Sequence, residues 1–402
     1  LLNTSKGAIN RTKPVAVRTR TSDMRGSTAG LADTLTSGSR AHTALLEFAD
    51  ILFASVVVAP AVVTYWKSTW SLMDLYVLTE DPVSSAAVCA GFGLGLDLLF
   101  CVFQAQFSKY LRPDRGRLTY YVLSRIYTCV AAIACVSGWR GVWNLLNECT
   151  GDSARTLLST TVAATLSLAA LRTLRNICAA PFAVAVDSPQ DYFGIPTMFR
   201  TPRAEAVLEI VDILFTILVA GPLVIIYWKA TWTLIDLYIY PEDYLLSAAC
   251  SASFGIMFGL ILCALQTPLN KILTPDVGQI KYFIFSRLYT MFAGVVNVAA
   301  CRGVWNLHEY TPKLSNWCSH IVSLSLLILL NCSNSILVRG VYIDAEEPAG
   351  DCVVFPCHYL RLFFHKERIK KRQKGSIAAA PTSATKKIEE ASVPLQTPEE
   401  KV

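Results

Sequence analysis

The sequence predicts an all-α polytopic membrane protein whose eight transmembrane helices form two parallel four-helix repeats. Composition is the first observation: 53% of the 402 residues are hydrophobic and 16% are charged, against about 25% charged in soluble domains. The second is a series of apolar runs of about 20 residues, the length that crosses the hydrocarbon layer of a bilayer. The third is an internal repeat, because residues 47–81 return 162 residues later as 209–243 with 19 of 35 positions identical.

The internal repeat covers several motifs. Each copy contains YWKxTWxLxDLY, at 65–76 and 227–238, and RGVWNL, at 140–145 and 302–307. Because these motifs recur together at one constant separation, each copy corresponds to a whole folded half.

Four apolar runs occur in each half, and we expect each run to be a transmembrane helix. A β-barrel is rejected because the runs are apolar on all sides and do not alternate in polarity. Since four crossings return the chain to its starting side, both halves enter the bilayer in the same orientation. The eight predicted helices cover residues 45–66, 84–107, 118–138, 154–174, 207–228, 245–266, 282–301 and 315–338.

Basic residues outside these runs are unevenly divided. The tails and the even-numbered loops, with Arg172 at the end of the fourth run, hold 28 Lys and Arg residues, and the odd-numbered loops, with Arg155 at the start of that run, hold 6. By the positive-inside rule, both termini are cytosolic, and no nucleic-acid partner is needed to explain the basic charge. The predicted organisation is a disordered cytosolic tail (1–44), a first membrane repeat (45–178), a cytosolic linker (179–206), a second membrane repeat (207–340), a basic amphipathic segment (341–374) and a disordered tail (375–402).

Two acidic and two basic residues fall inside the predicted helices at matching depths. Asp50 and Asp212 lie in the first helix of each half, and Arg125 and Arg287 in the third. A charge in the hydrocarbon layer costs about 2.5 to 3.5 kcal/mol, so each needs a partner. We expect the pairs Asp50–Arg125 and Asp212–Arg287, either as clamps between helices or as part of a polar cavity that binds an ion.

Asp97 differs from these residues because its counterpart in the second half is Gly259. A single acid in mid-helix is a candidate for handling a proton or cation during transport. The alternative is a protonated or hydrogen-bonded side chain, with Gln104 as one partner.

Duplicated aromatic residues gather near the outer ends of the predicted helices. We interpret them as anchors in the lipid headgroup layer, with an aromatic box for an organic cation as the alternative. The residues are Trp66, Trp70 and Trp143 with their copies Trp228, Trp232 and Trp305.

The same two motifs carry opposite charges. Asp74 lies near the end of the first motif and Arg140 begins the second, and Asp236 and Arg302 repeat the arrangement. We expect an ion pair in each half that ties a loop segment to a helix end.

Small residues recur in the second helix of each half, including Gly93 and Gly255. Such residues let helix backbones approach closely. We expect packing between the halves, or between protomers of a homo-oligomer, with a discontinuous transporter helix as the alternative.

The segment 352–374 combines aromatic residues with a dense basic cluster. It is expected to lie along the anionic inner leaflet of the membrane, with Cys352 and Cys357 as candidates for palmitoylation. A zinc site formed by these cysteines with His358 and His365 is the alternative, although the spacing matches no usual ligand pattern.

No motif of enzymatic chemistry is present: the chain lacks HExxH, GxSxG and a Walker A loop. We therefore expect no catalytic residues, no metal and no cofactor.

The paired YWKxTWxLxDLY and RGVWNL motifs on an eight-pass chain resemble the fuseless family of invertebrate neuronal membrane proteins. This resemblance implies an eight-pass protein of the presynaptic plasma membrane that organises the active zone and places calcium channels for synaptic transmission. It implies presynaptic partner proteins, calcium channels among them, and no catalytic residue. The alternative function is secondary transport of a small solute or ion through a cleft between the repeats, lined by Asp97 and the predicted ion pairs.

Overall fold

The computed structural model describes residues 40–178, 184–189, 192–195, 206–273, 278–310, 315–339, 359–362 and 364. Within these residues every regular element is helical. The first half contains α2 (Arg40–Phe53), η2 (Ala54–Val58), α3 (Ala59–Tyr76), α4 (Pro82–Tyr110), α5 (Arg117–Cys149), α6 (Ala154–Ala170) and η3 (Leu174–Cys178). The second contains α7 (Ala206–Phe215), η4 (Thr216–Ala220), α8 (Gly221–Tyr238), α9 (Tyr244–Ile272), α10 (Gln279–Leu307), η6 (His308–Tyr310), α11 (Asn316–Leu329) and η7 (Ser333–Arg339).

Helix starts recur at the same separation as the sequence motifs. Asp81 caps α4 by accepting hydrogen bonds from the backbone N–H groups of Val83 and Ser84, and Asp243 caps α9 in the same way through Leu246. Hydrogen bonds from Ser84 lower the pKa of the Asp81 carboxyl. Because such a cap satisfies backbone donors that have no partner within the helix, the duplicated residues start the same helices in both halves.

The first long helix of each half contains a short π-helical turn. These turns, η2 and η4, lie just before Pro60 and Pro222. Proline has no N–H to donate, and its ring clashes with the carbonyl four residues earlier, so the wider turn keeps the helix continuous. Ala44–Tyr76 and Val207–Tyr238 are consequently single spans of 33 and 32 residues.

Six helices of the described residues are long and apolar enough to cross a membrane, three in each half. These helices mark an integral membrane protein. Eight spans are not confirmed, because α6 and α11 have only 17 and 14 residues. At 1.5 Å per residue they measure roughly 26 and 21 Å, short of the about 30 Å of a bilayer core.

The two short helices end at residues with left-handed backbone, Arg172 (φ 56°) and Asn331 (φ 54°). At α6, the N–H of Thr173 donates to the carbonyl of Leu168 at 2.8 Å, which closes the helix end. The chain then forms the buried 3-10 segments η3 and η7. Hydropathy alone predicted one span of 154–174 because it counts apolar residues and does not register the turn that divides them.

Within each half, the second and third long helices approach closely at small residues. A Cβ on Gly93 of α4 would lie 2.1 Å from the backbone nitrogen of Gly138 on α5. At the equivalent place, a Cβ on Gly255 of α9 would lie 2.3 Å from Ala300 of α10. The glycines therefore pack helices of the same half, whereas the sequence led us to expect contacts between halves or protomers.

Replacing Gly93 with leucine is expected to lower the free energy of unfolding by about 1–3 kcal/mol, because the added carbons meet backbone that cannot move aside. Gly91→Leu is the matched control, since nothing lies within 4 Å of a Cβ at that position of the same helix. Chemical unfolding of the purified protein in detergent measures the difference. Equal stability of the two variants would contradict the close approach of α4 and α5.

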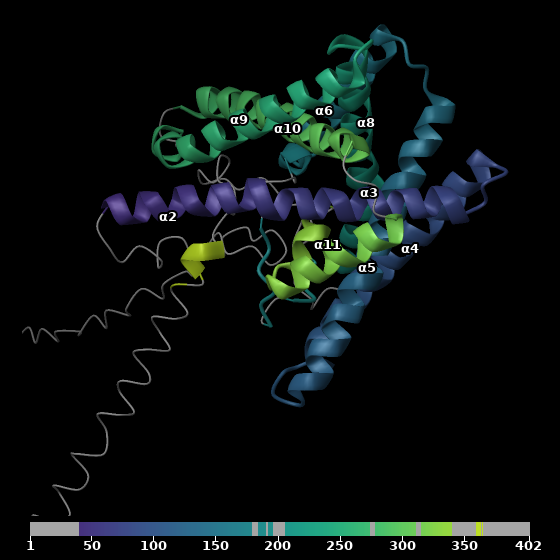
Figure 1. Cartoon of the computed structure of the whole chain (residues 1–402), viewed down its shortest axis with the longest axis vertical. Coiled ribbons are helices and arrows are strands. Elements are labelled where there is room, and N and C mark those ends of the chain that lie inside the picture. Colours follow the sequence, from purple (N-terminus) through teal and green to yellow (C-terminus); the bar gives the residue numbers. More distant parts are fainter. Residues whose placement is uncertain are drawn as a thin grey trace, which may run out of the picture.

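The two halves are interlocked through their fourth helices. The fourth helix of the first half, α6, packs against α8 of the second half, and α11 of the second half packs against α3 of the first. In Figure 1, α6 is labelled next to α8 of the second half, and α11 lies beside α3 of the first. Each half therefore completes its core with a helix from the other.

Candidate functional site

Four tryptophans from four different helices form a closed ring, here called the outer tryptophan ring. Neighbouring ring centroids are 6.0 Å apart for Trp70 and Trp143, 5.7 Å for Trp143 and Trp232, 5.9 Å for Trp232 and Trp305, and 5.7 Å for Trp305 and Trp70. Neighbouring planes are perpendicular, with angles of 89° or 90°. The helices are α3, α5, α8 and α10, so the duplicated motifs supply two members each.

Three further tryptophans form a second layer one helical turn away, here called the inner tryptophans. Trp139 lies 5.5 Å from Trp66 and 5.6 Å from Trp228, again edge to face. The fourth place of this layer, 162 residues after Trp139, is held by Cys301. Both layers, with Cys301, Asn144 and Asn176, line a cavity of about 280 Å³ between the two halves.

These tryptophans line an interior cavity, whereas the sequence led us to expect anchors in the headgroup layer. The inner tryptophans are no more than 7% exposed, and the indole N–H groups of Trp66 and Trp228 donate to the carbonyls of Ile336 and Ile177 at 3.1 Å. On α3, α5 and α8, the inner and the outer tryptophan are four residues apart, which places both on one helix face. That face is turned toward the opposite half, as in an aromatic box.

Two buried lysines join the halves beside the cavity. Lys67 forms an ion pair with Glu309 of the other half and donates to the carbonyl of Trp305 at 3.1 Å. Its counterpart, Lys229, lies 3.4 Å from Asp152 of the first half. Sequence reasoning counted both lysines as loop charges. Their repetition inside YWKxTW, between two tryptophans, was the available signal for an interior role.

The ion pairs expected from the duplicated motifs are present. In the first half, Arg140 Nε lies 2.8 Å from Asp74 Oδ1. In the second, Arg302 Nε lies 2.7 Å from Asp236 Oδ1. Both arginines are nearly inaccessible and also donate to serine hydroxyls, Ser85 in one half and Ser247 and Ser251 in the other. Each arginine thus connects three successive helices of its half.

The expected pair of Asp50 and Arg125 is wrong, because each residue has another partner. Asp50 Oδ2 lies 2.8 Å from Arg361 Nε, and Glu47 lies 2.9 Å from the same guanidinium. Tyr359 stacks on Phe53 of α2 with centroids 4.7 Å apart. The described part of the C-terminal segment therefore packs on α2, and its position along the inner leaflet stays a prediction. Matching depths along two helices did not reveal which way each side chain points.

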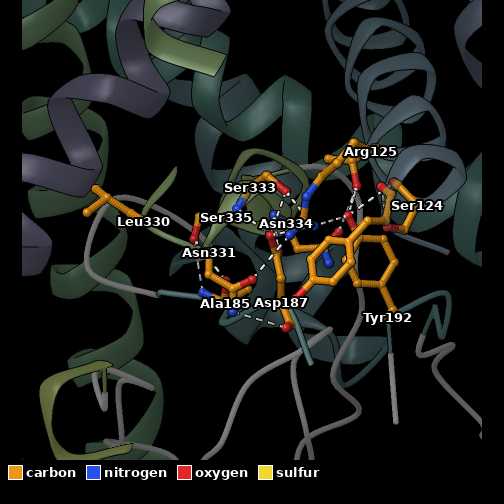
Figure 2. A network of polar contacts seen from close by, with 12 residues as sticks. Ser124, Arg125, Ala185, Asp187, Tyr192, Leu330, Asn331, Ser333, Asn334 and Ser335 are labelled. Carbon is orange, nitrogen blue, oxygen red and sulfur yellow. Dashed lines mark hydrogen bonds and ion pairs between the residues drawn. The ribbon is translucent and has the colours of Figure 1, made fainter. Parts of the chain in front are cut away.

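Arg125 belongs to a buried polar network that includes the linker between the halves. Its guanidinium lies 2.8 Å from Asp187 and donates to the hydroxyl of Tyr192 at 2.7 Å. Asp187 also accepts hydrogen bonds from the backbone N–H groups of Ser333 (3.0 Å) and Asn334 (2.9 Å), as Figure 2 shows. The network joins α5 of the first half, the linker and η7 of the second half.

Sequence reasoning treated the linker as a simple connection between the repeats. Most of its described residues, including Asp187, Tyr192 and Phe193, are almost fully buried, whereas Pro189 is exposed. A short apolar run with one acid, at 184–187, was the only available sign of this position.

The structure does not test the expected roles of several site residues, and these roles stay predictions. Asp212 is buried in α7, the guanidinium of Arg287 lies 4.5 Å from the ring centre of Phe283, and Asp97 is partly exposed on α4. An ion pair of Asp212 with Arg287 and a transport role of Asp97 stay predictions. Cys352 and Cys357, the zinc alternative that includes them, and the two predicted disordered tails lie outside the described residues, apart from 40–44 at the start of α2.

Comparison with known proteins gives one family. The Fuseless family model matches residues 45–216 and 207–313, well over half of the chain. Neither a curated protein nor a solved structure matches the chain significantly. The matched region contains both copies of the duplicated motifs and the tryptophans that form the cavity. The chain therefore belongs to the Fuseless family.

Proposed function

We propose that this protein is a non-enzymatic organiser of the presynaptic active zone, which places calcium channels for synaptic transmission. Family membership is the observation that carries the proposal. The protein would act in the presynaptic plasma membrane with both termini in the cytosol. Its membrane domain would serve as a platform, with the cytosolic segments as surfaces for presynaptic proteins.

Interlocking of the halves supports a platform. In many transporters, two repeats rock as rigid bodies around a central site. Here such rocking would separate α6 from α8 and α11 from α3. It would also break the hydrogen bonds of Trp66 and Trp228 to the opposite half and the pair of Lys67 with Glu309. These contacts oppose rocking of the two sequence halves against each other, which supports the platform.

The C-terminal segment suits the proposed partner surface. Arg361 is held by Asp50 and Glu47, and the hydroxyl of Tyr359 donates to the carbonyl of Leu330 at 2.6 Å. The described start of this segment, residues 359–362, is therefore fixed on the bundle. Attraction of the basic residues that follow to the anionic inner leaflet would keep those residues at the membrane surface.

Proximity labelling from the C-terminus in neurons tests this proposal. We expect labelling of active-zone proteins and calcium-channel subunits to exceed that from the same labelling enzyme on an unrelated multi-pass protein of the presynaptic membrane. Removal of the protein should also lower the calcium-channel signal at release sites. Labelling equal to the control, together with normal channel placement, would reject the organiser.

Secondary transport is the second candidate, and the cavity between the halves is the observation that favours it. Replacement of Asp97 by asparagine separates the two functions. Loss of solute uptake into vesicles, with normal surface amount and normal calcium-channel placement, would favour transport. Unchanged uptake would reject a transport role of Asp97, which is not among the residues that line this cavity.

A further inference from the structure

The tryptophan cavity uses nearly all the indole rings of the chain. The sequence contains eight tryptophans, and seven of them form the outer ring and the inner layer. Side chains in a structural core interdigitate and leave few voids larger than a water molecule. The seven indoles, with Cys301, Asn144 and Asn176, instead line a cavity of about 280 Å³. This cavity is therefore a candidate binding site.

Cys301 accounts for the space in the inner layer. Successive inner tryptophans contact each other at 5.5–5.6 Å, and the repeat predicts a fourth indole at the place that Cys301 holds. A thiol is far smaller than an indole. Because Cys301 stands where exact repetition would place a tryptophan, the cavity has free space on the side of α10.

The outer tryptophan ring has the dimensions of an aromatic cage. A group at the centre of a four-membered ring with sides of 5.7–6.0 Å lies within about 6 Å of every centroid, which is the range over which a cation is attracted by an aromatic ring. Tryptophan is the side chain that attracts cations most strongly in this way.

The groups around the cavity do not suit a metal ion or another inorganic ion. Its lining consists of indoles, one thiol and the amides of Asn144 and Asn176, so no carboxylate or imidazole is available for a metal ion. The nearby Lys67 and Lys229 are already paired with Glu309 and Asp152. An inorganic ion would lose its hydration without replacement, whereas a tetraalkylammonium group is only weakly hydrated.

We propose that the tryptophan cavity binds an organic cation with a trimethylammonium group, such as choline or a choline ester. The methyl groups contact the indoles, and the positive charge is stabilised by the quadrupoles of several rings at once. The site does not depend on the organiser role proposed above, and it can act either as a ligand sensor or as a structural cofactor site.

Binding is measured on the full chain in lipid nanodiscs, by titration calorimetry and by the change in intrinsic tryptophan fluorescence. The probes are choline and tetramethylammonium, and the control is 3,3-dimethylbutan-1-ol, the neutral isostere of choline. We expect choline to bind at least tenfold more tightly than the isostere. Equal affinities would show a merely apolar cavity and overturn the proposal, as would the absence of choline binding.

Three variants locate the site. Cys301→Trp fills the cavity and should abolish choline binding, whereas Cys301→Ser keeps the space and should retain it. Trp232→Leu removes one wall without adding bulk and should weaken binding about tenfold. The matched control is Trp317→Leu, the same change at the one tryptophan outside the cavity.

Size-exclusion chromatography and thermal unfolding verify that each variant is folded. If Cys301→Trp does not fold, the choline affinities of Trp232→Leu and Trp317→Leu are compared to test the site. Choline binding that is as tight in Trp232→Leu as in Trp317→Leu, or that survives in folded Cys301→Trp, would overturn the site.

Discussion

Replacement of Asp187 by alanine is expected to lower the free energy of unfolding by about 3–5 kcal/mol, because it leaves a buried guanidinium without its counter-charge. The side chain of Asp187 is 1% exposed and that of Arg125 is 16% exposed, so solvent cannot replace the lost carboxylate. The backbone N–H groups of Ser333 and Asn334 would also lose their acceptor.

Chemical unfolding in detergent measures this effect. The control is Asp114→Ala in the exposed loop between α4 and α5, which should change stability by no more than about 0.5 kcal/mol. The double replacement Arg125→Met with Asp187→Leu removes both charges and should recover part of the loss, because an apolar pair often replaces a buried ion pair without cost. If Asp187→Ala is as stable as the Asp114 control, the linker does not hold the bundle together.

Replacement of Arg302 by methionine is expected to lower the free energy of unfolding by about 3 kcal/mol. This value is at the lower end of the range for breaking a buried ion pair, because water can still reach Asp236. The side chain of Arg302 is 2% exposed, and its removal leaves the buried hydroxyls of Ser247 and Ser251 without a donor. Arg302→Lys should fall between wild type and Arg302→Met, since an ammonium cannot match the planar fork of the guanidinium.

The first half offers a graded comparison for this prediction. Arg140 has the same role but contacts the sulfur of Cys89, a weak acceptor, at the position equivalent to Ser251. Arg140→Met should therefore cost less than Arg302→Met, and Arg155→Met, at an exposed position, should cost almost nothing. The same unfolding measurement orders the three variants, and the reverse order would contradict the geometry.

The duplication made some contacts predictable from the sequence. Asp74 with Arg140 and Asp236 with Arg302 could be inferred because each pair recurs at one separation. Both members of a pair lie in the same half, so their contact is repeated together with that half. The tryptophans were recognised as a group because they are duplicated as well. The sequence did not show that their side chains all point toward the cavity. A spacing of four residues specifies a helix face without indicating whether lipid or protein covers it.

Contacts between segments that are not repeated were not predictable in this way. At the repeat separation, Asp187 has no acidic counterpart and Arg361 has no basic one. Composition assigned their segments to a cytosolic linker and a membrane-surface tail. Their partners lie far away in the sequence, so no periodicity relates them. The breaks at Arg172 and Asn331 were missed because hydropathy does not register a left-handed residue at a helix end.

The exchange of fourth helices has a consequence for how the protein is made. When synthesis has reached the linker, α3 already exists but α11, the helix that covers it, has not yet been translated. Until the second half has been synthesised, the first half must therefore stay in the membrane with the groove for α11 unfilled, and α6 lacks its partner α8. A gene fragment that ends in the linker would encode a product without a complete interior, so quality control at the site of insertion should remove it.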